Sequence, residues 1–173
     1  MIQGERISLR PIVMNDLQDC IRWVQDPEVM HHVLQHTVEP EDEKKWLEQA
    51  LVSDIEKTFI ITVKDTGQFI GTCAIHLIAT SPVLRNEPGV SIGLLIGEKS
   101  YWGKGYGAEV VKALAGYCHA NLNYERVWLT VDSIHARAIR AYEKAGFRIV
   151  RELTMPERIH SNGKQYLMEM LFA

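Results

Sequence analysis

Residues 100–109 read SYWGKGYGAE and place glycines at 103, 105 and 107 directly before a segment with helical periodicity. Glycine adopts conformations that other residues avoid, and it allows close approach to the main chain. The first turn of a helix carries unpaired N–H groups and a partial positive charge. With Lys104 adding a charge, the loop is predicted to bind a pyrophosphate largely through backbone N–H groups. The same glycines would also suit a tight strand-to-helix turn that binds no ligand.

The spacing of these glycines excludes two common phosphate-binding motifs. A Walker loop requires G-x-x-x-x-G-K-[ST], and no glycine in this chain is followed by Lys-Ser or Lys-Thr. The dinucleotide fingerprint G-x-G-x-x-G would require glycine at position 108, where the chain has alanine. An NAD-dependent enzyme is therefore not supported.

The composition is that of an ordinary globular protein, with 46% hydrophobic and 24% charged residues among 173. This length suits one domain, predicted to span 1–173. The formal net charge of -3 argues against a general nucleic-acid binder. Charge is unevenly distributed, because residues 99–151 hold 9 of the 19 basic residues and only 4 of the 22 acidic ones. That segment is suited to an anion, and the rest of the chain to a cation.

The three cysteines, at 20, 73 and 118, are odd in number and widely spaced. They support no zinc ribbon, redox pair or disulfide framework, so a reducing, cytoplasmic setting is predicted. The N-terminus shows no signal-peptide pattern, and no apolar run approaches the ~20 residues that cross a membrane. His31, His32 and His36 cluster in sequence without further ligands, so no metal site is predicted.

The order of apolar patterns predicts an α/β fold with a mixed sheet. Strands are expected at 7–10, 58–64, 69–78, 90–96, 126–131, 147–152 and 165–172. Helices are expected at 17–25, 39–53, 105–121 and 135–145, with a short helix or loop at 27–36. The apolar run at 90–96 indicates a buried central strand. Helix 39–53 is expected to turn four residues inward, namely Trp46, Leu47, Ala50 and Leu51.

A second motif lies at residues 135–147, which read HARAIRAYEKAGF. This segment resembles the closing signature of the GNAT superfamily of N-acetyltransferases, and the glycine loop resembles the pyrophosphate loop of the same superfamily. The segments ISLRPIVMNDL (7–17), PEVMHHVL (27–34) and NGKQYLMEML (162–171) are similar to one branch of it. That branch contains ribosomal-protein N-terminal (alanine/serine), spermidine and aminoglycoside 6'-N-acetyltransferases. The resemblance covers essentially the whole chain.

The resemblance implies a single-domain GNAT fold: a twisted, mostly antiparallel sheet flanked by about four helices, with two central parallel strands that splay apart around acetyl-coenzyme A. By position, these strands are 90–96 and 126–131. The family's pyrophosphate contacts fall on Gly103, Lys104, Gly105, Tyr106, Gly107 and Ala108. Further coenzyme contacts are expected at Leu95, Ile96, Ser133, His135, Arg137, Ala138, Tyr142 and Lys144.

Two positions depart from the family pattern near these contacts. Trp102 stands where the family signature often has Arg or Gln, and it is expected to pack rather than bind phosphate. His135 stands where the family often has a coenzyme-contacting asparagine, so this contact differs in reach and pH dependence. Ser133, at the end of the preceding strand, is the alternative donor.

The family tyrosine that acts as general acid falls on Tyr142. A phenol with a pKa near ~10 is protonated at neutral pH and can donate to the departing coenzyme A thiolate. By helical spacing alone, Tyr142 would be a core residue. A β-bulge near 95–97 would aim the amides of Leu95 and Ile96 at the thioester carbonyl and stabilise its developing charge.

The attacking amine must lose a proton before it reacts. Many relatives carry an acid on the strand before the glycine loop, often as EIG, where this chain has Ser91-Ile92-Gly93. Glu87 and His76 are candidate replacement bases, and proton loss through a chain of waters is a third route.

These features predict an acetyl-coenzyme A-dependent N-acetyltransferase that acts by direct transfer, since neither motif contains a cysteine. The acceptor is a primary amine: a protein N-terminal α-amine, a polyamine or an aminoglycoside. His31 and His32 are expected to flank the acceptor pocket. The alternative is a non-catalytic module that binds acetyl-coenzyme A as a sensor. The resemblance favours a homodimer, and no nucleic acid, membrane or metal partner is expected.

Overall fold

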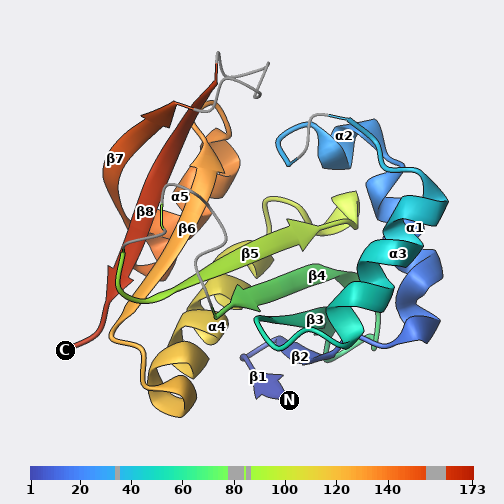
Figure 1. Cartoon of the computed structure of the whole chain (residues 1–173), viewed down its shortest axis with the longest axis horizontal. Coiled ribbons are helices and arrows are strands. Elements are labelled where there is room, and N and C mark those ends of the chain that lie inside the picture. The colour runs from blue at the N-terminus through green and yellow to red at the C-terminus, as the bar shows by residue number, and fades with distance from the viewer. Residues whose placement is uncertain (34–35, 78–83, 85–86, 155–162) are drawn as a thin grey trace.

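An eight-stranded mixed sheet forms the centre of the computed structural model (Figure 1), in the order β1-β2-β3-β4-β5-β6-β8-β7. The structure describes the whole chain except residues 34–35, 78–83, 85–86 and 155–162. The strands are β1 (Ile2–Gln3), β2 (Ile7–Pro11), β3 (Glu56–Val63), β4 (Phe69–His76), β5 (Val90–Ile96), β6 (Arg126–Asp132), β7 (Arg148–Thr154) and β8 (Lys164–Leu171). All neighbouring pairs of these strands are antiparallel except β5 and β6. The predicted α/β fold, with one central parallel pair, is confirmed.

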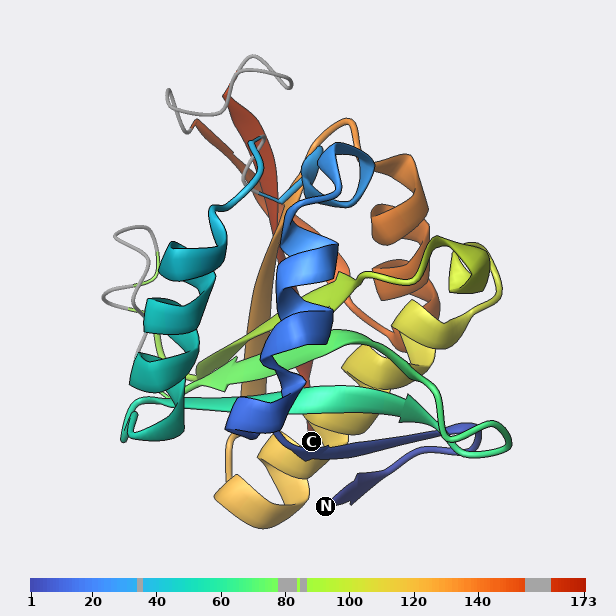
Figure 2. The same cartoon turned by 90° about the vertical axis from the view of Figure 1, so that its right-hand side faces the viewer.

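Helices cover both faces of this sheet (Figure 2). They are α1 (Leu17–Val24), α2 (Pro27–Met30), α3 (Pro40–Leu51), α4 (Tyr106–Leu122) and α5 (Ala136–Ala145). Successive strand residues point to opposite faces. Accordingly, Ile60 packs in the core beneath α1 and α3, whereas Ile61 packs in the core beneath α4. Because β5 is covered on both faces, its sequence is nearly all apolar.

Some details of the sequence prediction need correction. The two-residue strand β1 was not predicted, because it is too short to show a period. Leu51 was expected to face inward but is 41% exposed, while Glu43 of the same helix is only 7% exposed. The buried stripe of α3 therefore passes through Glu43 and Leu47, and burial raises the pKa of Glu43 to about 7. Ile78, the expected end of one strand, lies outside the described residues.

The parallel strands β5 and β6 separate soon after they meet. The structure describes both strands in full. They pair at two positions, with Val90 opposite Val127 and Ser91 opposite Trp128. Beyond Ser91, β5 continues beside β4 and β6 continues beside β8. The two strands diverge in Figure 1, and backbone groups on their facing edges lack a strand partner there. This opening positions the candidate site.

Candidate active site

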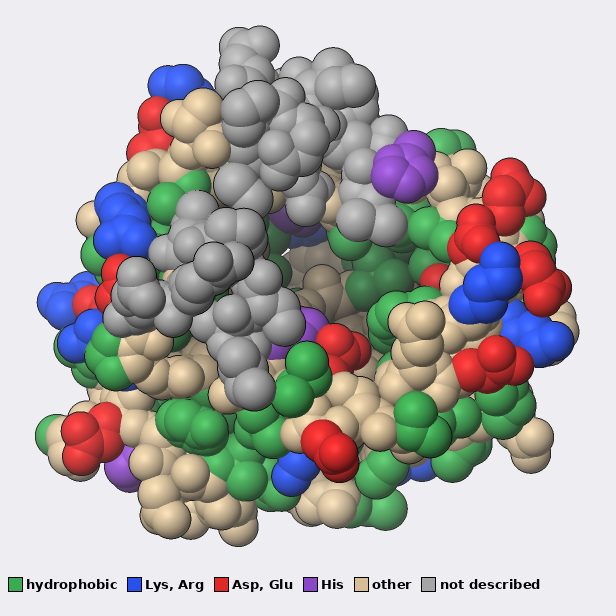
Figure 3. All heavy atoms as spheres, in the orientation of Figure 1, with side chains coloured by type: hydrophobic (Ala, Val, Ile, Leu, Met, Phe, Trp, Pro, Cys, Tyr) green, Lys and Arg blue, Asp and Glu red, His purple; other side chains and the backbone are tan. Residues whose placement is uncertain are grey.

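A cleft of about 780 Å³ lies where β5 and β6 separate, and a hollow is visible on the face shown in Figure 3. Its size is typical of a pocket for a small molecule or cofactor. All of the predicted coenzyme-binding residues except Ser133 line the cleft, as do His32 and His76. Glu87 and His31 are not among its lining residues. Sequence motifs far apart in the chain therefore converge on one site.

The glycines of the loop before α4 serve two purposes. Gly103 and Gly105 have positive φ angles of +74° and +86°, and Gly105 is the N-cap of α4. Side chains disfavour this left-handed conformation, which explains these two glycines. Gly107 is already helical, and a Cβ there would lie 3.5 Å from Leu94 Cδ2. Because this loop lines the cleft, the unpaired N–H groups of the first turn of α4 are placed at the cleft wall.

An Arg6–Glu109 clamp holds this loop against the start of β2. The backbone N–H groups of Arg6 and Ile7 donate to Glu109 Oε1 at 2.6 and 3.2 Å, and Arg6 Nε donates to Oε2 at 2.9 Å. Arg6 Nη1 also donates to the Lys104 carbonyl at 3.1 Å. Burial acts to raise the pKa of Glu109, but its contacts with Arg6 hold it below the ordinary value. Neither residue was singled out from the sequence, because they are far apart in it.

Trp102 packs at the cleft wall, as predicted. Its indole Nε1 donates to the Ile96 carbonyl at 2.8 Å. The guanidinium carbon of Arg137 lies 3.9 Å from the centroid of its ring, a cation–π contact. The indole thus orients Arg137 beside the glycine loop, where a phosphate group would find a positive charge.

Tyr142, on α5, belongs to both the core and the cleft. It is 9% exposed, packs near Phe147 and lines the cleft. Burial raises the pKa of its phenol to about 12. The side chain is therefore protonated at neutral pH, as a proton donor must be. The core position and the catalytic role are compatible, and the catalytic role stays a prediction.

The irregularity expected near 95–97 lies at the end of that range, at Gly97 and Glu98. The pairing of β4 with β5 is regular through Ile96. Directly after it, the amides of Gly97 and Glu98 both donate to the Ile70 carbonyl, at 2.8 and 3.1 Å. Two residues thus oppose one, as in a β-bulge. The role of the Leu95 and Ile96 amides toward a thioester stays a prediction.

His76 and Glu87, the two candidate bases, occupy different surroundings. His76 lines the cleft, and its Nδ1 lies 3.1 Å from Glu56 Oε2. Glu87 Oε1 lies 3.1 Å from Arg151 Nη1, in an ion pair outside the cleft lining. The structure therefore brings His76, and not Glu87, to the site. Glu56 was not singled out from the sequence.

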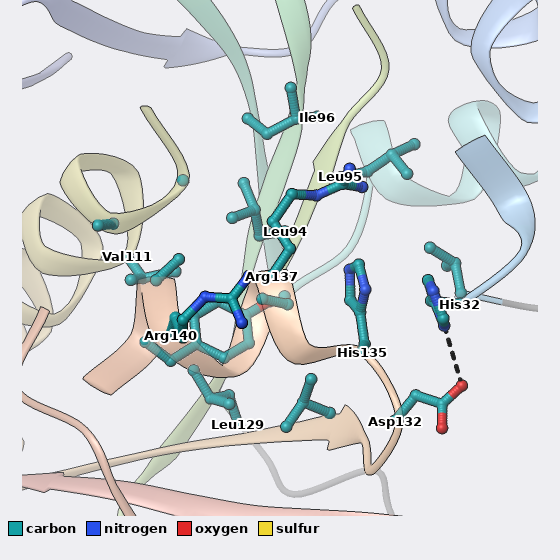
Figure 4. A pocket seen from close by; sticks show the side chains of 18 of the residues that line it. His32, Leu94, Leu95, Ile96, Val111, Leu129, Asp132, His135, Arg137 and Arg140 are labelled. Carbon is teal, nitrogen blue, oxygen red and sulfur yellow. Dashed lines mark hydrogen bonds and ion pairs between the residues drawn. The ribbon is translucent and has the colours of Figure 1, made fainter. Parts of the chain in front are cut away.

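A histidine cluster joins the segment after α2 to the start of α5 (Figure 4). The rings of His32 and His135 stack with centroids 3.9 Å apart, and His32 Nδ1 lies 3.2 Å from Asp132 Oδ2. Asp132 is 2% exposed. Burial, followed by the nearby charges of His32 and Arg137, lowers the pKa of His135 to about 4. His135 is therefore neutral at pH 7 and retains one ring N–H for a hydrogen bond.

His31 is exposed and makes an edge contact with the His32 ring, with centroids 4.5 Å apart. Within the described part of the chain, no group of three or more His, Cys, Asp or Glu side chains could hold a metal ion. The described helices also include none that is long and apolar enough to span a membrane. All three cysteines are buried with free thiols.

Residues 6–148 match the family model described as the acetyltransferase (GNAT) domain. Because the match spans more than half of the chain, this protein belongs to the GNAT acetyltransferase family. It is also similar to a curated relative from Bacillus licheniformis named an uncharacterised N-acetyltransferase p20, with 26% identity over 83% of this chain and 80% of the relative. The chain is thus an N-acetyltransferase domain by family.

Solved structures share the fold at low sequence identity. A GNAT-family acetyltransferase from Bacillus anthracis has a TM-score of 0.82 and 20% identity, covering 98% of this chain and 97% of that one. Spermidine N-acetyltransferase from Vibrio cholerae, in complex with coenzyme A and spermine, has a TM-score of 0.81 and 17% identity, covering 96% and 95%. Aminoglycoside acetyltransferase AAC(6')-Ib, in complex with coenzyme A, has a TM-score of 0.80 and 22% identity, covering 95% and 94%.

Proposed function

We propose that this protein transfers the acetyl group of acetyl-coenzyme A directly to a primary amine. The observation that carries the proposal is the single cleft that joins the glycine loop, Tyr142 and His76 at the separation of β5 and β6. The loop supplies an anion site, the phenol a proton donor and the imidazole a proton acceptor. Together, these three functions suit the binding of coenzyme A and the transfer of an acyl group from its thioester to an amine.

The coenzyme binds along the glycine loop and α5. Amides of residues 103–108 contact the pyrophosphate, and Lys104, Arg137 and Lys144 add positive charge to the same wall of the cleft. The pantetheine chain then lies between β5 and β6, where the facing strand edges lack a partner. Backbone N–H groups near Leu95 and Ile96 stabilise the oxyanion as the amine attacks the thioester carbonyl.

Proton transfers complete the reaction. The acceptor ammonium loses a proton to His76, and the resulting amine attacks the carbonyl carbon. When the C–S bond breaks, Tyr142 donates its proton to the coenzyme A thiolate. The nitrogen of the tetrahedral adduct loses its second proton, which restores the phenol through solvent, and the imidazolium releases the first proton. The net products are therefore an acetamide, coenzyme A and one proton.

The charged side chains that line the cleft indicate what charge the acceptor carries. Among the described residues that line it, the carboxylates are Glu28 and Asp132, and these contact Lys99 and His32 respectively. A polycation such as spermine or an aminoglycoside would compete with those contacts. This balance favours an acceptor with one principal positive charge, such as a protein N-terminal α-amine, over the polyamines and aminoglycosides named for the structural neighbours.

A panel assay tests the proposal. Release of free thiol from acetyl-coenzyme A is measured with an alanine- or serine-starting ribosomal-protein peptide, spermidine, spermine and kanamycin. Turnover with the peptide alone supports the stated acceptor class, and faster turnover with spermine or kanamycin contradicts the charge argument. If no amine is acetylated although acetyl-coenzyme A raises the melting temperature, the coenzyme site stands and catalysis with these acceptors fails.

We also propose that the protein acts in the cytoplasm as a single domain spanning 1–173 and assembles as a homodimer. Buried, unpaired cysteines support the first statement. Light scattering on the purified chain measures its mass, and a monomer across the working concentration range would contradict the dimer.

A further inference from the structure

Three adjacent strands place Glu56, His76 and Ser91 in one row across the sheet. His76 on β4 is directly opposite Glu56 on β3 and directly opposite Ser91 on β5. Side chains at opposed positions of neighbouring strands lie on the same face and within reach of each other. The row therefore leads from a carboxylate behind the cleft, through an imidazole, to the cleft wall formed by β5.

The two ring nitrogens of His76 have different surroundings. Nδ1 lies 3.1 Å from Glu56 Oε2, close enough for an ion pair although outside the alignment of a good hydrogen bond. Nε2 lies over Gly93, since a Cβ at that residue would be 3.5 Å from it, and Gly93 lines the cleft. A proton on Nδ1, facing the carboxylate, leaves the lone pair of Nε2 directed at the cleft.

Glu56 is itself held in place. Thr58 Oγ1 donates to Glu56 Oε1 at 2.9 Å, and the backbone N–H of Glu56 donates to Ser53 Oγ at 3.0 Å. The contact with His76, and then that with Thr58, keep the pKa of Glu56 below its ordinary value against the opposing effect of burial. The carboxylate is therefore ionised at neutral pH. Glu56 does not line the cleft, and its contact with the cleft is the one through His76.

The described strands and helix nearest this row carry few other charges, and helix α3, which packs against β3, carries the buried Glu43. On β3, the neighbouring Lys57 alternates to the other side of the strand. On β5, Ser91 and Gly93 carry no charge. Helix α1, which packs against β4, carries Asp19 and Arg22, and these two form an ion pair. Among the described residues, Glu56 is the charged group whose contact with His76 the structure shows.

We infer that Glu56 and His76 form a proton-accepting dyad for the acceptor amine, in which Glu56 is a positioning residue. This inference rests on the proposed acetyl transfer. The substrate N–H bond breaks and its proton bonds to His76 Nε2, directly or through one water, while the nitrogen lone pair is freed to attack the thioester. The imidazolium is stabilised by the Glu56 carboxylate until its proton passes to solvent.

The experiment compares the pH dependence of kcat/KM for His76→Asn, Glu56→Gln and the wild type, with the best amine of the panel as acceptor. His76→Asn is expected to lower kcat/KM by about 100-fold or more, as for loss of a general base, with unchanged acetyl-coenzyme A affinity. Glu56→Gln is expected to lower it by about tenfold, within the range of general-base effects, and to move the acidic limb to lower pH. Without the carboxylate, the protonated ring loses its neighbouring negative charge.

Two matched variants separate these effects from general damage. Glu152→Gln removes a carboxylate from the Lys164–Glu152 pair on β7 and β8, outside the cleft, and His119→Asn removes a ring from α4 that stacks on Phe172. Both are expected to keep the wild-type profile. In the His76→Asn background, Ser91→Glu places a carboxylate at the neighbouring position of the row. Partial recovery of kcat/KM is expected, because a base then returns to the same part of the cleft.

A second readout does not depend on turnover. Nitrogen-15 spectra of histidine-labelled protein report which ring nitrogen of His76 carries the proton. The wild type is expected to show the Nδ1–H form, and Glu56→Gln to shift toward Nε2–H. The dyad would be overturned if His76→Asn and Glu56→Gln both turned over as fast as the wild type with the same pH profile. An Nε2–H tautomer of His76 in the wild type would also overturn it. Failure of the wild type to acetylate any amine would instead count against the proposed function, and the spectra would still decide the tautomer.

Discussion

The two sides of the cleft are built in different ways. The loop side, residues 101–108 and 135–144, comes from two continuous segments, one leading into α4 and one running along α5. The strand side, consisting of His32, His76, Ser91 and Asp132, combines the segment after α2 with three strands. The helix start and glycines that predict an anion site there are encoded locally. The strand side acquires its chemistry only when register brings single residues together.

The largest effect on activity is expected on the loop side, at the proposed general acid Tyr142. Tyr142→Phe removes one hydroxyl and should lower kcat by about 10²- to 10⁴-fold, the usual contribution of a general acid. Acetyl-coenzyme A affinity and the melting temperature should stay close to wild type. Steady-state kinetics and isothermal titration provide the measurements, with Tyr117→Phe on α4 as the control outside the cleft lining. A kcat like that of the control would leave Tyr142 as a core residue.

The Arg6–Glu109 clamp tests whether the loop side depends on distant residues. Glu109→Gln should lower the free energy of unfolding by about 1–3 kcal/mol, because partly buried N–H groups lose a charged acceptor. It should also weaken acetyl-coenzyme A binding. Since the folded-state pKa of Glu109 is below its ordinary value of 4.5, the wild-type advantage is complete above that pH and is lost as pH falls further. Urea unfolding at a series of pH values measures it, with exposed Glu125→Gln as the control.

Two glycines of the loop should respond differently. Gly105→Ala forces a side chain into a positive φ and should cost about 1–2 kcal/mol of unfolding free energy. Gly107→Ala should be neutral or slightly stabilising, because that residue is helical and its new Cβ meets Leu94 at ordinary contact distance. Chemical unfolding of both variants decides the point. Equal losses of unfolding free energy in the two variants would contradict the distinction between Gly105, which needs a positive φ, and Gly107, which does not.

The smallest effect is expected where the two sides meet, at the His32–His135 stack. The pKa of His135 is lowered to about 4 in the folded chain. As pH falls below the ordinary value of 6.5, His135 is therefore protonated in the unfolded chain before it is protonated in the folded chain. The folded state therefore loses stability between those values. His135→Asn removes this contribution, so its melting temperature should fall less than that of the wild type across the window. Thermal scans at several pH values measure the difference, and parallel curves would exclude a buried, neutral His135.

Much of the loop side could be predicted from the sequence. The glycine spacing, the helix periodicity and the YEK segment predicted where Gly103, Gly105 and Tyr142 would lie, and all three line the cleft. The prediction failed to find Arg6 and Glu109 as a pair, because their contact spans two elements that are remote in the chain. It also left His76 and Glu87 as equal candidates, since only strand register places one in the cleft and the other beside Arg151.

The sequence by itself determined the class of fold and the turn before α4. The central parallel pair was implied by the resemblance to the GNAT superfamily, and the anion site at the start of α4 stays a prediction. The fold class and the turn follow from short-range rules: apolar periodicity, helix starts and the conformational range of glycine. Only the tertiary structure decided which titratable groups meet at the strand side. Glu56 and His76 acquire their relationship from the register of β3 against β4, and His32 and Asp132 from the contact between the segment after α2 and the end of β6. Such pairings depend on the packing of the whole sheet, and no local pattern in the chain encodes them.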